Sequence, residues 1–594
     1  MSLPVLSPAS LKSGCATLAL GGALSVLVAL WVPNLLHSAA LTAEAAQVRW
    51  LEAAGLGAIF WLLSAALLGR LWLVLLLALP VALLWPLELW LRWHNGTPIS
   101  SHLVALVLES NWAEGANFFS AYGVELLWLT LAWLLLYAAG CWWAWRLDVR
   151  WRHRSRWYIG VIFLSLLGLL HQSKSAHDAL GSSFKTDALD DPSISGWALQ
   201  WADVYPVNVP LALLHFYQQQ SKLHALQAAL GQRSLQAQQA AEADLPEVVV
   251  LVIGESASAT RWGLLGYGRN TTPQLAQESG LVAFSDVVSL SVATRTAVPG
   301  VLSRRPLLQP SGNLDMAAEP SLLQAFAQVG YQTHWLSNQS PMGQHDTSIS
   351  MYAREAANVR FLNPATYQHR SHFDEVLLNP LRDVLAQPGR HLIVLHLLGS
   401  HFDYSLRYPT SFDHFQPSLQ SAPVSTDAAR YAEQVSNTYD NSLRYTDHIL
   451  AQVLNALKQR GGNAVMTYFS DHGVDPAQGQ CASQIPNRRS EAAYRVPALV
   501  WLSPSMRAQQ PMQWLRLQDN AHQPYTTRAL YATLLGLAQI DVVGGLPSES
   551  FLQRPALPLP PRMVAGMGGG LVDFDVVRQK NACFIVANSY RSSE

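Results

Sequence analysis

The sequence predicts two parts of different class: an α-helical membrane domain of five spans, followed by an exported α/β domain built on a mainly parallel sheet. Half of the 594 residues are hydrophobic, 13% are charged and 21 are Trp, which is too apolar for an ordinary soluble domain. The apolar residues gather before residue 171, whereas β-branched runs alternate with helical patterns from residue 247 onward. We therefore expect a membrane domain at 1–171, a linker at 172–246 and the α/β domain at 247–594.

The membrane domain is predicted from apolar segments close to the roughly 20 residues that a helix needs to cross a bilayer. A single such segment could be a buried core helix, but several in succession favour membrane spans. We interpret the first as a retained anchor, because no small-residue cleavage site follows it. The five segments are Ala16–Leu36, Trp50–Leu68, Leu71–Trp93, Val124–Trp145 and Trp157–Leu170.

The orientation of the spans follows from basic residues near the membrane. Arg146, Arg150, Arg152, Arg154 and Arg156 lie between the fourth and fifth segments. Loops rich in Arg stay on the cytoplasmic side, so an odd number of spans places everything after the fifth segment outside.

One polar interval lies between the third and fourth spans, and a linker follows the fifth. The interval His94–Ala121 falls on the outer face and contains Glu114, which could face a substrate or be a solvated loop carboxylate. In the linker Gln172–Pro246, apolar residues recur at helical spacing over Leu211–Ala243, which predicts an amphipathic helix that bridges anchor and domain.

The exported part reads as strands that alternate with helices, a pattern typical of a parallel sheet covered on both faces. The net charge of -1 gives no reason to expect a nucleic-acid partner. Cys481 and Cys583 both fall in this part, where an oxidising compartment would permit a disulfide, although the sequence does not show whether they are close. The expected strands are Val248–Gly254, Tyr331–Leu336, His391–Leu397, Ala464–Ser470 and Val496–Leu502, and the expected helices are Leu322–Val329, Val376–Ala386 and Tyr431–Lys458.

Acidic and imidazole side chains follow two of these strands. Glu255 comes directly after the first strand, and Asp471 and His472 follow the strand at 464–470. The carboxyl ends of parallel strands meet at one edge of a sheet, where ligands bind in open α/β folds. Carboxylate oxygen and imidazole nitrogen suit zinc, although a strand-end Asp beside an incidental His is the plainer alternative.

Two more residues at this edge could carry chemistry. Thr294 lies at the start of a possible helix, where its hydroxyl either caps the helix or, beside a cation, acts as a nucleophile toward phosphorus. His401 follows the strand at 391–397, and a lone His of this kind is more often structural than functional.

The motifs together resemble the membrane-anchored phosphoethanolamine transferases of Gram-negative envelopes, in the alkaline phosphatase/sulfatase superfamily. The amino-acid sequence around His396–Pro409 and Tyr439–Asn441 is most similar to the branch that modifies the heptose of the lipopolysaccharide inner core. The resemblance covers nearly the whole chain and is carried by Gly254–Ser256, Leu265–Pro273, His396–His401 with Arg407–Pro409, and Tyr468–Gly473.

The resemblance implies an alkaline phosphatase/sulfatase-like fold and a role for each candidate residue. Glu255, Thr294, Asp471 and His472 would ligate Zn2+, with Thr294 as nucleophile and Thr296 as the fallback for that role. His401 would bind phosphate or move a proton, while Glu114 and Asn338 would contact substrate.

The implied reaction transfers phosphoethanolamine from phosphatidylethanolamine to lipopolysaccharide, with inner-core heptose favoured over lipid A. The enzyme would be a multi-pass monomer of the inner membrane with its catalytic domain in the periplasm.

Some positions depart from the family pattern. Val474 replaces an acidic residue, no His occurs in Val474–Ala492, and no Lys occurs around Asn338–Thr347. These departures affect residues expected at a second metal site and in the phosphate-binding set, and they leave the residues expected at the primary zinc site in place. The alternatives are a phosphoglycerol transferase, a hydrolase of phosphate or sulfate esters, or a non-catalytic membrane scaffold that retains the fold.

Overall fold

The structure is a computed structural model, and its chain divides into two compact units. One consists of 1–105, 118–217 and 589–594, and the other of 106–117 and 218–588. The structure describes residues 21–36, 43–95, 98–99, 103–104, 107–108, 112–162, 165, 201, 204–239, 245–312, 314–339, 348–363, 372–425, 427–476, 490–565 and 571–580.

The first unit is helical, and its helices overlap the apolar segments of the sequence. A helix over 21–31 continues as η1 (Val32–Leu35), and is followed by α2 (Ala43–Leu68), α3 (Leu71–Ala82), α4 (Trp85–Asn95) and α6 (Trp112–Arg146). Within α6, Gly123–Arg146 is long and apolar enough to cross a membrane. The pair Leu71–Ala82 and Trp85–Trp93 meets that test together across a 60° bend, and Gly21–Leu35 and Ala53–Leu68 are shorter apolar helices. The number of spans therefore stays a prediction.

Buried hydrogen bonds to Glu88 join two helices of this unit. Within α4, Arg92 Nε lies 2.6 Å from Glu88 Oε1, and the Asn208 side-chain amide donates to both carboxylate oxygens of Glu88. Asn208 is the first residue of α9 (Asn208–Leu230), so its hydrogen bonds link the start of that helix to α4.

The predicted linker helix ends earlier than its apolar periodicity indicated. We expected Leu211–Ala243, but α9 ends at Leu230, immediately before Gly231, a residue favoured after helix ends. The chain then runs along α12 (Leu322–Gln328), where Gln324 and Gln328 accept the backbone N–H groups of Leu235 and Ala237. It ends in the short strand β1 (Gln238–Gln239), which pairs with β11 (Ile540–Asp541).

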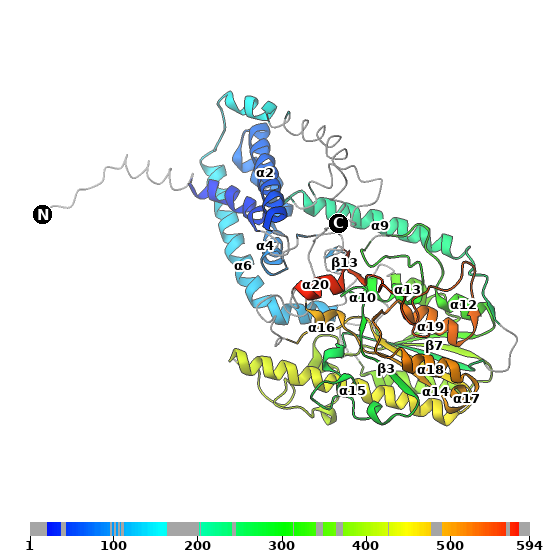
Figure 1. The fold of residues 1–594 in the computed structure, drawn as a ribbon. Coiled ribbons are helices and arrows are strands. Elements are labelled where there is room, and N and C mark those ends of the chain that lie inside the picture. Colours follow the sequence, from blue (N-terminus) through cyan, green and yellow to red (C-terminus); the bar gives the residue numbers. More distant parts are fainter. Residues whose placement is uncertain are drawn as a thin grey trace. The chain divides into compact units, whose positions relative to one another are not determined.

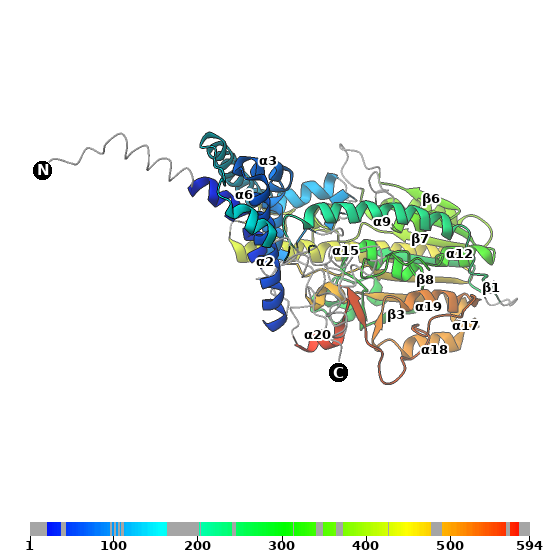
Figure 2. The same ribbon diagram turned by 90° about the horizontal axis from the view of Figure 1, so that it is seen from above.

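The second unit contains a seven-stranded sheet in the order β3-β9-β8-β2-β7-β5-β6, and Figure 2 shows β6 and β3 on opposite sides of it. The strands predicted from continuous apolar runs are confirmed within one or two residues at each end. The sheet consists of β2 (Val248–Gly254), β3 (Leu281–Phe284), β5 (Gln332–Ser337), β6 (Asn358–Phe361), β7 (His391–His396), β8 (Ala464–Ser470) and β9 (Ala498–Leu502).

The sheet is mixed rather than fully parallel. Strands β8, β2, β7, β5 and β6 run parallel to one another, but β9 is antiparallel to both β8 and β3. The described residues that follow β8 and those that precede β9 lie together at the carboxyl edge, because Gly473 N donates to Ala493 O and Ser470 N donates to Pro497 O. The chain therefore enters β9 from that edge and must run in the opposite direction.

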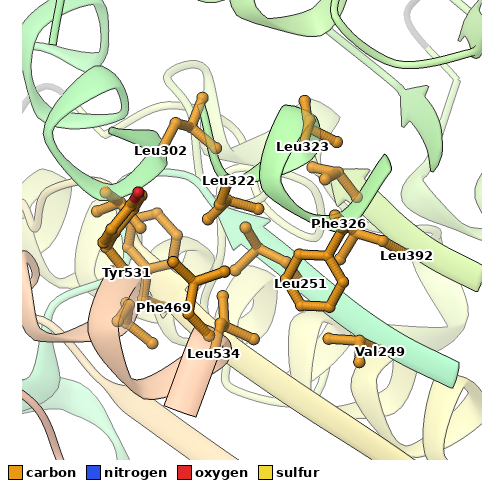
Figure 3. Close-up of a cluster of buried hydrophobic side chains, with 14 of the residues drawn as sticks. Val249, Leu251, Leu302, Leu322, Leu323, Phe326, Leu392, Phe469, Tyr531 and Leu534 are labelled. Atoms are coloured by element: carbon orange, nitrogen blue, oxygen red, sulfur yellow. The ribbon is translucent and has the colours of Figure 1, made fainter. Parts of the chain in front are cut away.

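Helices cover both faces of the sheet, with α12 on one side and α15 (Ala428–Arg460) on the other (Figure 1). Alternate residues of β2 enter two separate cores: Val249 and Leu251 pack under α12 and α19 (Ala529–Leu537), and Val250 packs against α14 (Leu378–Leu385) and α15. Figure 3 shows side chains of α12, α19 and β2 meeting in the first of these cores. Because β2 and β8 are buried on both faces, the loops that follow them begin from strands that are held firmly in place.

The remaining described elements of this unit are short and connect the layers. They are η4 (Ala259–Arg261), η5 (Gly263–Leu265), η6 (Leu275–Gln277), β4 (Val287–Val288), α10 (Thr294–Ala297), α11 (Pro299–Leu302), α13 (Ser348–Ala353), η7 (Asp374–Leu377), η8 (Tyr404–Leu406), η9 (Thr410–Phe412), α16 (Glu491–Tyr494), α17 (Pro504–Gln509), α18 (Pro511–Asp519), β10 (Tyr525–Thr526), β12 (Met563–Ala565), β13 (Leu571–Asp573) and α20 (Phe574–Lys580).

Candidate metal centre

Two neighbouring parallel strands deliver the acidic residues of the site. Gly254 at the end of β2 pairs with Ser470 at the end of β8, so Glu255 and Asp471 leave the sheet side by side. Ser256 then turns the chain with a left-handed φ of 59°, which is uncommon for a residue with a side chain. The adjacency that the sequence predicted for Glu255 and Asp471 is present.

The three candidate ligands converge in space. One ligand atom from each of Glu255, Asp471 and His472 lies within 4.8 Å of the others. His472 Nε2 is 3.4 Å from Glu255 Oε1 and 3.5 Å from Asp471 Oδ2. Two ligands about 2.1 Å from a tetrahedral zinc are separated by about 3.4 Å. The spacing therefore fits a single zinc ion.

The orientation of His472 also fits a metal ligand. Its Nδ1 lies 3.0 Å from the carbonyl oxygen of Gly473, so Nδ1–H donates there and the lone pair of Nε2 faces the carboxylates. Gly473 cannot be replaced without a local shift, because an added Cβ would meet Ala492 O at 2.1 Å.

The electrostatics of the cluster call for a cation. Glu255, Asp471 and His472 are each at most 2% exposed. Burial and the neighbouring Asp471 raise the pKa of the Glu255 carboxyl well above its ordinary value. Oδ2 of Asp471 has no hydrogen-bond partner among the residues that the structure describes. A buried acid pair with an unused oxygen is costly unless a positive ion compensates it.

Thr294 adjoins this cluster, and Thr296 does not. Thr294 Oγ1 donates to Glu255 Oε2 over 3.2 Å, and the N-cap of α10 is Ala293, so the helix-cap interpretation of Thr294 is wrong. Thr296 Oγ1 is bonded to Ser291 Oγ and Ala293 O within its own loop.

Gln339 is a site residue that the sequence did not reveal. Its Nε2 lies 3.5 Å from Glu255 Oε2 and donates to Leu397 O over 3.0 Å. The predicted substrate residue Asn338 is buried, and its amide nitrogen donates to Asp374 Oδ1 and His372 O. The substrate role of Asn338 stays a prediction, whereas its neighbour is the residue that reaches the cluster.

The loop after β7 brings His401 to the same edge of the sheet. Gly399 has a φ of 52°, and a Cβ there would lie 2.7 Å from Glu255 O, so only glycine permits this approach. His401 Nδ1 is 2.8 Å from Phe402 O, and Arg407 Nε donates to the carbonyl of His401. The catalytic role of His401 stays a prediction.

Three predicted residues lie wholly or partly outside the described part of the chain. Glu114 falls within the bounds of α6, but its side chain is not described. Cys481 and Cys583 both lie outside the described residues, so their predicted disulfide is untested.

Comparison with known proteins places these features in a family context. Residues 247–540 match the family described as Sulfatase. The phosphoethanolamine transferase EptC of Escherichia coli K12 is 29% identical over 314 residues, which cover 51% of this chain and 53% of that protein. The chain thus aligns with about half the length of the curated relatives it matches.

Two solved structures share the fold. The C-terminal periplasmic domain of E. coli EptC, crystallised in complex with Zn, has a TM-score of 0.52 and 26% identity, covering 59% of this chain and 98% of that domain. The integral membrane lipooligosaccharide phosphoethanolamine transferase A of Neisseria meningitidis has a TM-score of 0.60 and 20% identity, covering 91% of this chain and 96% of that protein.

Proposed function

We infer that this chain is a zinc-dependent phosphoethanolamine transferase of the envelope. The match of residues 247–540 to the Sulfatase family is consistent with this proposal. The observation that carries the proposal is the buried cluster of Glu255, Asp471 and His472 with the Thr294 hydroxyl on its rim. Relatives named as phosphoethanolamine transferases, and a zinc complex of one related domain, support it.

The reaction has two half-reactions. The Thr294 oxygen attacks the phosphorus of phosphatidylethanolamine, and the bond from phosphorus to the glycerol oxygen breaks, so that diacylglycerol leaves with a proton. A hydroxyl oxygen of the acceptor then attacks the phosphorus of the phosphoethanolamine–threonine ester, the bond from phosphorus to the Thr294 oxygen breaks, and that oxygen takes up the proton released by the acceptor hydroxyl. Zinc, when bound, would lower the pKa of the threonine hydroxyl and offset charge on the phosphoryl oxygens.

Several residues of the chain support this chemistry from fixed positions. Glu255, Asp471 and His472 would hold the ion, and Thr294 would be both nucleophile and fourth ligand. Gln339 offers amide hydrogens beside Glu255 and so suits a phosphoryl oxygen. His401 would bind phosphate or carry a proton, and Glu114 and Asn338 would contact the substrate.

The proposed setting is the inner membrane of a Gram-negative cell. Five spans within 1–171 would anchor the chain, 172–246 would link it to the catalytic domain, and the domain at 247–594 would lie in the periplasm as a monomer. The acceptor is lipopolysaccharide. Inner-core heptose is favoured over lipid A because the sequence motifs around Tyr439 and His401 resemble those of the heptose-modifying branch.

Replacement of Thr294 by Ala tests the nucleophile directly. We expect Thr294→Ala to abolish transfer of phosphoethanolamine to lipopolysaccharide, measured by mass spectrometry of lipopolysaccharide from cells that carry only the variant. The matched control is Thr296→Ala, which alters a hydroxyl bonded within its own loop and should retain transfer. A phosphoethanolamine mass on the peptide containing Thr294 is expected when acceptor is withheld. Normal transfer by Thr294→Ala would reject the proposal.

A further inference from the structure

One stretch of α15 is polar and yet fully enclosed. Helix surfaces in the core are usually apolar, so a run of buried polar residues needs partners. The partners come from loops at the carboxyl edge of the sheet: Tyr439 contacts 256–258, Asp440 contacts Arg261 and Arg269, and Ser442 contacts Ser400. The residues of this run that are at most 6% exposed are Gln434, Ser436, Asn437, Thr438, Tyr439, Asp440, Asn441 and Ser442.

The Tyr439 side chain is hydrogen-bonded to the turn that follows Glu255. Its hydroxyl donates to Ser256 O over 2.8 Å and accepts the N–H of Ser258 over 2.9 Å. The phenol therefore satisfies the carbonyl of the left-handed residue Ser256 and the backbone N–H two residues later, at Ser258. Left-handed backbone costs free energy for a residue with a side chain and persists where its surroundings impose it.

The conformation of Ser256 determines how both carboxylates point. Ser256 Oγ donates to Glu255 Oε1 over 2.6 Å, and Ser256 N donates to Asp471 Oδ1 over 3.0 Å. These bonds leave Asp471 Oδ2 directed toward His472 Nε2. A relay of hydrogen bonds thus runs from the Tyr439 phenol through Ser256 to two of the proposed metal ligands.

We propose that Tyr439 is a positioning residue for the zinc centre: its phenol fixes the 256–258 turn, and that turn sets the geometry of Glu255 and Asp471 toward the ion. The inference rests on the proposed zinc site and adds a residue that touches neither metal nor substrate. Partners one shell beyond a ligand typically contribute 10- to 100-fold to metal affinity.

The test is Tyr439→Phe in the purified full-length chain. Phe keeps the aromatic ring, whose centroid lies 5.0 Å from the ring centroid of Tyr404, and removes only the hydroxyl. We expect the Kd for Zn2+, measured by competition with a chromophoric chelator, to rise by about tenfold. We also expect the visible absorption of bound Co2+ to change, because that spectrum reports the arrangement of the ligands.

The matched control is Tyr352→Phe. Tyr352 is also 0% exposed, and its phenol also accepts one backbone N–H, from Leu307, and donates to one backbone carbonyl, of Glu319. Both variants leave a buried donor and acceptor unpaired, so both should lower the melting temperature of the metal-free protein. Only Tyr439→Phe should change Zn2+ affinity and the Co2+ spectrum.

The outcomes separate the inference from the proposed function. Equal Zn2+ affinity and equal Co2+ spectra in wild type and Tyr439→Phe, or equal losses in Tyr352→Phe, would overturn the positioning role alone. A wild-type protein that does not bind Zn2+ would overturn the proposed site itself. If Tyr439→Phe does not fold, Ser256→Gly replaces it, since glycine accepts the left-handed φ and the –CH2OH side chain that donates to Glu255 is lost. Unchanged Zn2+ affinity in Ser256→Gly would then contradict the relay.

Discussion

The replacement of Glu255 by Gln should change stability and metal binding in opposite directions. Glu255 and Asp471 are buried acids whose ligand atoms lie within 4.8 Å of each other. Two unit charges at that separation repel by about 3 kcal/mol at an effective dielectric constant of about 20. The gain from removing one charge is smaller than this to the extent that Glu255 already holds a proton, so we expect the metal-free variant to be more stable by about 1–3 kcal/mol.

The same change should weaken zinc binding severely. Gln keeps the shape of the side chain but loses the negative charge that the ion requires. We expect the Kd for Zn2+ to rise more than 100-fold, which corresponds to more than about 2.7 kcal/mol. Chelator competition measures the affinity, and urea unfolding of the chelator-treated full-length protein measures the stability.

A second Glu→Gln variant provides the control with the opposite sign. Glu319 is paired with Arg304, whose Nη2 lies 3.2 Å from Glu319 Oε1. Glu319→Gln should therefore destabilise the protein slightly and leave Zn2+ affinity unchanged. A metal-free Glu255→Gln protein that is less stable than wild type, or one that binds Zn2+ normally, would refute the view that an uncompensated acid pair is held for a metal.

Two further variants test separate features of the structure. Gln339→Leu removes the amide beside Glu255, so the kcat of transfer at saturating Zn2+ should fall about tenfold; an unchanged kcat would exclude Gln339 from the reaction. Burial raises the pKa of Glu355 from 4.5 to about 7 although Ser321 donates to it, so the stability it contributes is complete below pH 4.5 and is lost as the pH rises through 7. Between pH 5 and 8 the melting temperature of Glu355→Gln should therefore change less with pH than that of the wild type. An unaltered pH dependence would contradict this assignment.

Much of the α/β unit was predictable because its strands are continuous apolar runs with abrupt ends. The segments that became β2, β7 and β8 are buried on both faces, and such strands need no polar alternation. Since their carboxyl ends carry Glu255 and Asp471, the rule that parallel strands finish at one edge was sufficient to bring these residues together.

The rest depended on contacts between distant segments. Gln339 reaches Glu255 only because β5 lies beside β7 and the Leu397 carbonyl holds the amide, and neither fact is encoded locally. The antiparallel direction of β9 follows from hydrogen bonds that hold 490–497 beside the end of β8, which strand propensity does not describe. The early end of α9 did have a signal in Gly231, but the Gln- and Ala-rich periodicity beyond it outweighed that signal in the prediction.

The wide separation of the ligands along the chain bears on when the protein becomes active. Ser256 and Asp471, which are hydrogen-bonded in the finished site, are 215 residues apart. A growing polypeptide that already displays Glu255 and Thr294 therefore lacks Asp471 and His472 until β8 has been made and inserted between β2 and β9. If the proposed site is correct, a chain cut short before that strand should bind no Zn2+ there.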